Sequence, residues 1–210
     1  MDANRFPAQA WSASLRRAVT GAVVAASLVG AGAAARACGY EDPSAASFQR
    51  GVLNMVYPKA LYVQGAVSQA ILHGIIATPQ AAIPIGKDLF GLGYRRSAEL
   101  LRQFGDQLKP DGSDNLSISL VLIEPMLWTR YSIKGGTVSA SVHVNGPEAG
   151  DLVVITAEAS MKAMMERRVT FQQAEALGLL HVYGDPAKAA RFQALAEQRD
   201  GLAEAATVGQ

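Results

Sequence analysis

The first half of the chain repeats its apolar residues at helical spacing. They recur every three or four positions between Val63 and Ile75, and the same period returns between Leu89 and Leu108. Ahead of both stretches stands the pair Asp42-Pro43, which marks a helix start because the carboxylate accepts hydrogen bonds from free first-turn amides while proline fits the first helical position. Pro58 ends that first helix and can open the next. We therefore expect the first half to be helical throughout.

Beyond the turn-rich sequence 109–115 (KPDGSDN), the apolar period shortens from 3.6 to 2 and the residues become β-branched and aromatic. A glycine pair, Gly135-Gly136, suits a hairpin turn between two of the resulting strands. A second Asp-Pro pair, Asp185-Pro186, marks the last helix. The predicted strands are 116–124, 127–134, 137–144, 151–156 and 179–185, and the predicted helices are 157–168, 170–178 and the stretch from 186 onward.

This order predicts an α+β protein: a helical N-terminal half is followed by a five-stranded, mostly antiparallel sheet with two crossover helices and a C-terminal helix. We divide the chain into a signal peptide (1–37), a helical segment (38–110) that packs on or extends the main domain, and an α+β domain (111–210).

The signal peptide is predicted from the order of its parts. A segment with Arg5, Arg16 and Arg17 precedes an uncharged run rich in Ala and Gly, which closes on Ala35-Arg36-Ala37. Basic, apolar and small-x-small is the order of a secretory signal, and we expect cleavage after Ala37 and a periplasmic or otherwise exported protein. A membrane anchor is the competing interpretation of the apolar run.

Removal of the signal changes the charge balance. The 19 basic and 18 acidic residues of the full chain become 15 and 17, so the mature chain is slightly acidic. It has no run of lysine and arginine that could follow a phosphate backbone, and we expect no nucleic-acid partner.

Cys38, the only cysteine, would become the first residue of the mature chain. A bacterial lipoprotein carries its acyl chains on such a thiol, and a membrane-anchored lipoprotein is therefore the alternative localisation. Ala35 and Arg36 depart from the usual lipoprotein box, and a free terminal thiol is the other interpretation. A single cysteine excludes a disulfide within the chain.

Residues 115–198 resemble the sterol carrier protein type-2 family. The similarity lies in GDLVVITAEASMKAMMERRVTFQQAEALGLLHVYGDPAKAARFQALA, where a strand leads into a helix, a short helix ends at Gly178, and a strand ends in Gly184-Asp185 before a last helix. The resemblance implies an apolar tunnel between sheet and helices that holds a lipid-like molecule. The residues that would line it are Met161, Met164, Met165, Phe171, Val182, Phe192 and Leu195. Methionine suits such a wall because its thioether is flexible, although the same side chains could equally form an ordinary core.

No catalytic, metal or cofactor motif is evident, so we expect no catalytic residue, no metal and no cofactor. His143 is predicted on the polar face of its strand, and it could converge with His181 only if their two strands were neighbours. Trp128 and Arg130 share a strand face and could form a stacking and charge patch or a simple cation-π pair.

Two classes of function remain. The first is a non-enzymatic, exported envelope protein that binds or carries an apolar, lipid-like small molecule. The second is an accessory or scaffold subunit of an envelope complex, which would use the helical first half to contact a protein partner and Cys38 as its lipid anchor.

Overall fold

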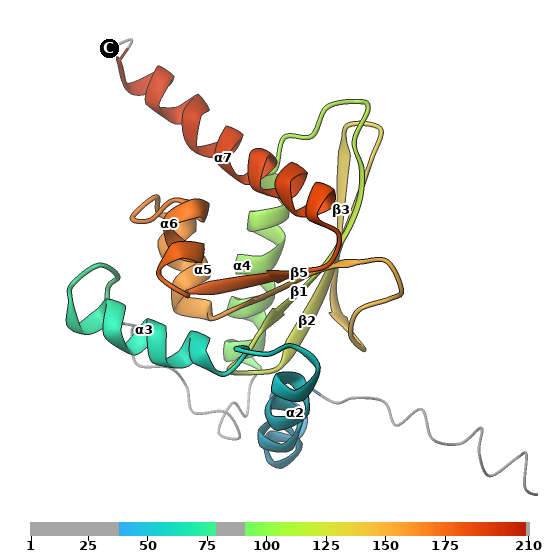
Figure 1. Ribbon diagram of the computed structural model, residues 1–210, viewed down its shortest axis with the longest axis vertical. Coiled ribbons are helices and arrows are strands. Elements are labelled where there is room, and N and C mark those ends of the chain that lie inside the picture. The colour runs from blue at the N-terminus through green and yellow to red at the C-terminus, as the bar shows by residue number, and fades with distance from the viewer. Residues whose placement is uncertain (1–37, 79–90, 209–210) are drawn as a thin grey trace, which may run out of the picture. The chain divides into compact units, whose positions relative to one another are not determined.

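The computed structural model describes residues 38–78 and 91–208, with side chains described as far as Gln198. The predicted signal peptide and the predicted helical position Leu89 lie outside the described residues. The helices are α2 (Pro43–Val56), α3 (Tyr62–Leu72), α4 (Leu92–Gln107), α5 (Glu158–Met165), α6 (Phe171–Ala176) and α7 (Pro186–Val208), and the strands are β1 (Asn115–Leu122), β2 (Leu127–Lys134), β3 (Thr137–Val144), β4 (Leu152–Thr156) and β5 (Leu180–Tyr183) (Figure 1).

The five strands form one sheet in the order β3-β2-β1-β4-β5. β1 pairs in parallel with β4, and the other three pairings are antiparallel. The two helices α5 and α6 connect β4 to β5, and α7 follows β5. The predicted α+β class and the mostly antiparallel sheet are therefore confirmed, and the order of elements is the one that the sterol carrier resemblance implies for the second half.

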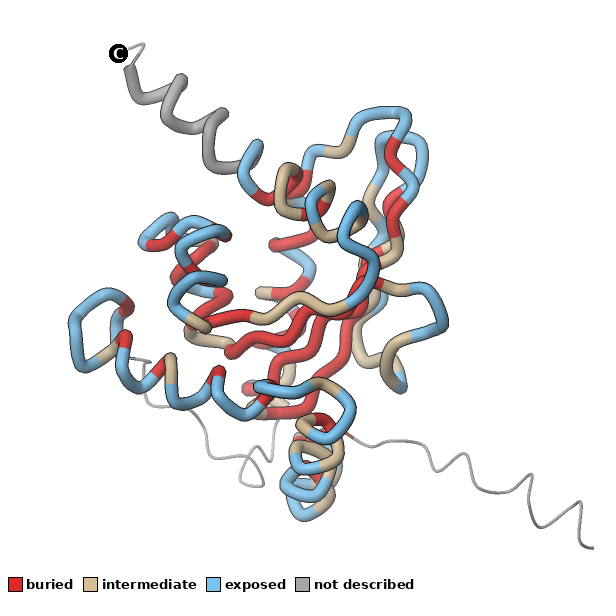
Figure 2. Tube along the Cα trace, in the orientation of Figure 1, coloured by how far each residue is buried: buried red, intermediate tan, exposed pale blue. Residues whose placement is uncertain are grey.

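The alternating strand pattern divides the sheet into an inner face and an outer face. Ile118 and Leu120 of β1 lie opposite Tyr131 and Thr129 of β2, and all four side chains are fully buried on the inner face. α4 packs closely here, because a Cβ added at Gly105 would lie 3.0 Å from the Tyr131 ring. Buried residues are concentrated along the central strands and on the helix faces turned toward them (Figure 2).

Local sequence explains where several elements begin. The Asp42 carboxylate accepts hydrogen bonds from the amides of Ser44 and Ala45, and the Asp185 carboxylate accepts from those of Ala187 and Lys188. Both Asp-Pro pairs therefore start helices, as predicted. Gly135 and Gly136 both have positive φ, 57° and 78°, which a tight hairpin between β2 and β3 requires.

The start of α3 differs from the prediction. Pro58 does not open this helix, which begins at Tyr62, and the intervening residues form a turn in which Lys59 has φ 75°. Two contacts hold the turn: the Asn54 side chain accepts from the amide of Leu61, and the Tyr183 hydroxyl donates to the carbonyl of Pro58. These contacts replace the helical hydrogen bonds that a helix from Pro58 would make.

The helical first half shares the core of the sheet. Leu53 of α2, Val63 of α3 and Leu101 of α4 are buried in the same apolar cluster as the inner strands. In contrast, Phe48 and Met55 on α2 are 76% and 83% exposed. Since they are seven residues apart, they lie on one face of the helix.

Candidate functional site

The seven side chains predicted to line a ligand site come together between the inner face of the sheet and α5 to α7. Five of them are at most 2% exposed, while Met165 and Val182 are partly buried and pack against the same cluster. The fully buried five are Met161, Met164, Phe171, Phe192 and Leu195. We call the seven residues the apolar interior.

Aromatic contacts tie the apolar interior to α4. The Phe192 ring of α7 lies 5.1 Å, centroid to centroid, from Phe171 of α6 and 6.4 Å from Phe104 of α4, both in edge-to-face geometry. Such pairs add to the stabilisation that burial alone gives. The three helices that flank this region are thus connected through one ring.

Two buried hydroxyl groups lie on elements that flank this region, one on β2 and one on α5. Thr129 Oγ1, on the inner face of β2, and Ser160 Oγ, one helical turn before Met164 on α5, make no hydrogen bond to any residue that the structure describes. Both residues are fully buried. A buried hydroxyl without a partner costs about 1 to 3 kcal/mol of folding stability. A ligand that forms a hydrogen bond with either hydroxyl would remove that cost.

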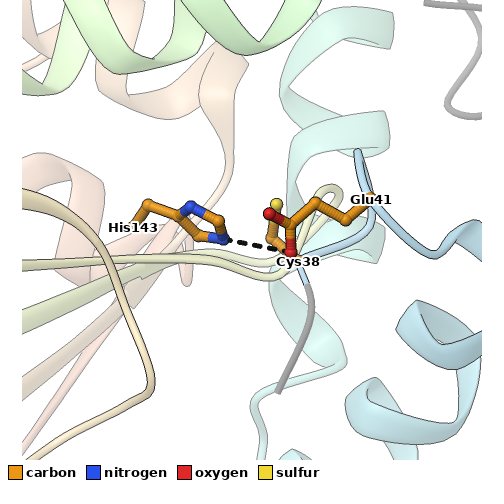
Figure 3. Close-up of side chains that lie close together, drawn as sticks. All are labelled: Cys38, Glu41 and His143. Atoms are coloured by element: carbon orange, nitrogen blue, oxygen red, sulfur yellow. Dashed lines mark ion pairs between the residues drawn. The ribbon is translucent and has the colours of Figure 1, made fainter. Parts of the chain in front are cut away.

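A second cluster lies where the described chain begins. Cys38, Glu41 and His143 place a thiol sulfur, a carboxylate oxygen and an imidazole nitrogen within 4.8 Å of one another. His143 Nε2 lies 3.4 Å from Glu41 Oε2. Figure 3 shows the three side chains pointing toward a common point. We call these residues, with Gly39 and Tyr40, the Cys38 corner.

The turn that holds Cys38 is fixed by its neighbours. The Gly39 amide donates to the carbonyl of Pro125 at 2.6 Å, and the amides of Glu41 and Asp42 donate to the carbonyl of Cys38 at 2.9 and 3.0 Å. Glycine suits this position because an added Cβ would lie 3.0 Å from the Ala46 Cβ and 3.0 Å from the Pro125 oxygen, so these neighbours would have to shift.

Tyr40 connects the same turn to two helices. Its hydroxyl lies 2.9 Å from Ser97 Oγ of α4, and Ser97 in turn donates to the Glu158 carboxylate at the start of α5. Each residue of the sequence CGYEDP therefore has a distinct structural role, from the buried thiol of Cys38 to the helix start at Asp42-Pro43.

His143 reaches the corner because β3 bulges. Thr129 pairs with Val142 and Trp128 pairs with Val144, so His143 is an extra residue in the strand, and its φ is 69°. The simple alternation that placed His143 on the polar face stops at Val142, and that prediction of its face does not hold. The imidazole instead contacts the Tyr94 ring of α4, with centroids 5.8 Å apart.

His143 and His181 do not converge. Their strands, β3 and β5, form opposite edges of the sheet. Burial lowers the pKa of His181, and the charge of Lys59 lowers it further. The condition under which the two imidazoles would converge, neighbouring strands, is therefore not met.

The thiol of Cys38 is almost fully enclosed, with 2% of the residue exposed. Burial raises its pKa, and the charge of Glu41 acts in the same direction, while hydrogen bonds from the backbone at Tyr40 and Glu41 partly oppose the shift. The neutral thiol is therefore favoured unless a cation lies beside it.

Arg130, predicted in a patch with Trp128, is engaged in an ion-pair network on the outer face. Asp151 accepts from Arg130 Nη2 at 2.7 Å and from the hydroxyls of Ser117 and Ser119 at 2.6 Å each. Burial opposes ionisation of Asp151, but these hydrogen bonds outweigh it and lower the pKa of Asp151 to about 2. The network fixes the loop between β3 and β4, because Glu148 also pairs with Arg130.

Comparison with known proteins gives matches to solved structures only. No family model and no curated protein sequence matches the chain. The solved structures include the stereoselective inverting sec-alkylsulfatase Pisa1 from Pseudomonas sp., at 17% identity and TM-score 0.40, with 60% of this chain aligned to 19% of the sulfatase.

Two further structures align over most of their own length. The ubiquinone synthesis protein UbiJ-SCP2 matches 50% of this chain and 96% of its own at 18% identity and TM-score 0.37. Sterol Carrier Protein 2 Like 2 from Aedes aegypti matches 49% of this chain and 99% of its own at 17% identity and TM-score 0.38. Similarity at this level does not transfer a function, which has to be argued from the side chains themselves.

Proposed function

We propose that this chain is an exported, non-enzymatic protein that binds or carries an amphipathic lipid-like molecule in its apolar interior. Two observations carry the proposal: methionine and aromatic side chains are buried together between the sheet and the helices, and two buried hydroxyls, at Thr129 and Ser160, have no hydrogen-bond partner among the described residues. Flexible thioethers adapt to an irregular hydrocarbon. A hydroxyl that lacks a partner can form a hydrogen bond with the polar group of such a ligand. Binding sites for largely apolar molecules typically contain a few polar groups that orient the ligand in this way.

Export is proposed on the sequence of residues 1–37, which has the order of a secretory signal. Among the residues that the structure describes, no helix is both long and apolar enough to cross a membrane. The proposed location of the mature protein is the periplasm or a corresponding exported compartment, with a lipid anchor on Cys38 as the alternative.

Thermal melting with a panel of ligands tests the binding. A fatty acid, a sterol and a quinone are each titrated into the purified chain, since a ligand that binds only the native state raises its stability by RT ln(1 + [L]/Kd). We expect one of these classes to raise Tm, and a variant with Ser160→Ala to lose part of that shift. Met55→Ala, on the exposed face of α2, is the matched control and should leave the shift unchanged.

Truncation of Met164 separates a ligand site from a filled core. In a filled core, Met164→Ala should cost about 2 to 5 kcal/mol. A severe loss in this variant, together with no Tm shift of the unaltered chain by any of the three ligand classes, would rule out the carrier function.

The exposed apolar face of α2 favours a second candidate, a scaffold subunit of an envelope complex. Phe48 and Met55 lie on this face, and Tyr62 at the start of α3 is 71% exposed. Exposed apolar side chains grouped in this way are typical of protein contacts. Crosslinking of the exported protein in its native host tests it: a defined crosslinked complex should disappear in the double variant Phe48→Asp/Met55→Asp and persist in Leu177→Asp, an exposed site outside α2.

A further inference from the structure

We propose that Cys38, Glu41 and His143 form a binding site for a single divalent transition-metal cation of borderline softness, such as Zn²⁺. The three side chains supply one sulfur, one oxygen and one nitrogen ligand within 4.8 Å of one another. Zinc in proteins is bound by these three kinds of side chain. A thiolate in the set disfavours Mg²⁺ and Ca²⁺, which take oxygen ligands.

The convergence of the three groups depends on two specific features of the backbone. Cys38 and Glu41 belong to one tight turn, closed by the hydrogen bond from the Glu41 amide to the Cys38 carbonyl. His143 comes from a distant strand and reaches this turn only because it is the extra residue of a bulge, with a left-handed φ of 69° that a residue other than glycine rarely adopts. Bulges of this kind frequently aim a side chain at a functional site.

The surroundings favour a rigid site. The Cys38 sulfur is enclosed, the imidazole is packed against Tyr94, and only Glu41 is more than half exposed. Glu41 can therefore move by the small amount needed to shorten its distance to the other two donors. Three protein ligands leave a fourth position on a tetrahedral ion for another group.

Cleavage after Ala37, a step that belongs to the proposed function, would supply a fourth ligand for the metal. The new α-amino group would lie on the same residue as the thiol, and a metal bound to both closes a five-membered ring. Cleavage is not needed for the three side chains to bind. Lipoprotein modification of Cys38, in contrast, would alkylate the thiol to a diacylglyceryl thioether and acylate the amine, so a lipoprotein and this site exclude one another.

Cobalt titration of the full chain tests the site. The reduced, chelator-treated protein is titrated with Co²⁺, and a thiolate-to-cobalt charge-transfer band in the near ultraviolet should grow to one Co²⁺ per chain. Added Zn²⁺ should displace it. The band should be absent in Cys38→Ser. In Glu41→Gln and His143→Gln the Kd should rise by more than about tenfold, a loss seen even for groups that only orient a ligand.

Matched control variants show whether Co²⁺ binds at other glutamate or histidine side chains. Glu99→Gln on α4 and His73→Gln, directly after α3, replace exposed residues of the same types and should leave the Kd unchanged. Glu41→Gln alters an exposed side chain and is expected to fold, which circular dichroism checks. An unaltered chain without the charge-transfer band overturns the proposal. So does a Kd that is the same in Glu41→Gln and His143→Gln as in the unaltered chain.

The amine is tested separately by comparing the full chain with the processed chain recovered after export. A tighter Kd in the processed chain supports the fourth ligand. An equal Kd removes the amine from the site and leaves the three side chains. If no processing occurs, the export proposal fails while the cobalt result on the full chain still stands.

Discussion

In the apolar interior, Phe192 contacts rings from two other helices, and its neighbours are apolar side chains that a different hydrophobic residue could partly replace. In the Cys38 corner, position depends on single hydrogen bonds and close contacts: one amide to the Pro125 carbonyl, one glycine at which an added Cβ would be crowded, and one bulged histidine. We therefore expect the first region to accept another apolar side chain of similar volume, whereas the second depends on the identity of particular residues.

Stability and ligand binding depend on different kinds of contact in these two regions. Burial of large apolar side chains supplies most of the free energy of folding. Directed polar groups contribute less to stability but fix the relative positions of donor atoms, which ligand binding requires. We therefore expect substitutions in the apolar interior to have large effects on unfolding, and those in the corner to have moderate effects on unfolding and large effects on metal affinity.

The largest effect is expected from Phe192→Ala. The residue is fully buried and contacts two rings, so its truncation should lower the free energy of unfolding by about 3 to 5 kcal/mol. Urea unfolding measures the loss, and Leu177→Ala, at a site that is 43% exposed, is the control with a much smaller effect. A loss below about 1 kcal/mol for Phe192→Ala would show that this region is loosely packed and would remove the contrast with the corner.

A moderate effect is expected from Gly39→Ala. The added Cβ meets the Pro125 carbonyl and the Ala46 Cβ at 3.0 Å, and relief of such crowding costs about 1 to 3 kcal/mol. Gly51→Ala on the exposed side of α2 is the matched control: its Cβ meets nothing within 4 Å, and alanine in a helix should stabilise by about 0.5 to 1 kcal/mol. Opposite signs of the two changes in urea unfolding support the close packing of the corner, and equal signs contradict it.

The sequence predicted the sheet region well because its signals are local and periodic. The alternation of apolar residues located all five strands, and the carboxylates of Asp42 and Asp185 located two helix starts. These features depend on neighbours within a few positions, which a single sequence contains. The order of the strands across the sheet, with β1 parallel to β4, depends on contacts between distant segments and could not be obtained in this way.

The Cys38 corner was missed for a physical reason. His143 is more than one hundred positions from Cys38 and Glu41 in the sequence, and it reaches them through a bulge that simple alternation does not predict. The signal that could have been used was the sequence CGYEDP itself, in which a thiol and a carboxylate stand three residues apart immediately before a capped helix. The side chains of the apolar interior were predicted from the resemblance to the sterol carrier family. Their burial is also what an ordinary core of helically spaced apolar residues would give.

The smallest effect on the free energy of unfolding is expected at Asp151, whose polar contacts lie on the outer face of the sheet. This residue shows whether directed hydrogen bonds contribute to stability. Its pKa of about 2 lies below the value of about 4 expected in the unfolded chain, so the carboxylate stabilises the fold at neutral pH. That contribution is fully present above about pH 5 and is lost as the pH falls through 4 toward 2.

Urea unfolding of the unaltered chain and of Asp151→Asn should differ most at neutral pH. The difference should shrink by at most about 2 kcal/mol as Asp151 becomes protonated, because the other titrating groups are common to both proteins. A difference that stays constant from pH 6 to pH 2, a range of about four units around the two pKa values, would show that the hydrogen bonds from Ser117, Ser119 and Arg130 do not favour the ionised carboxylate.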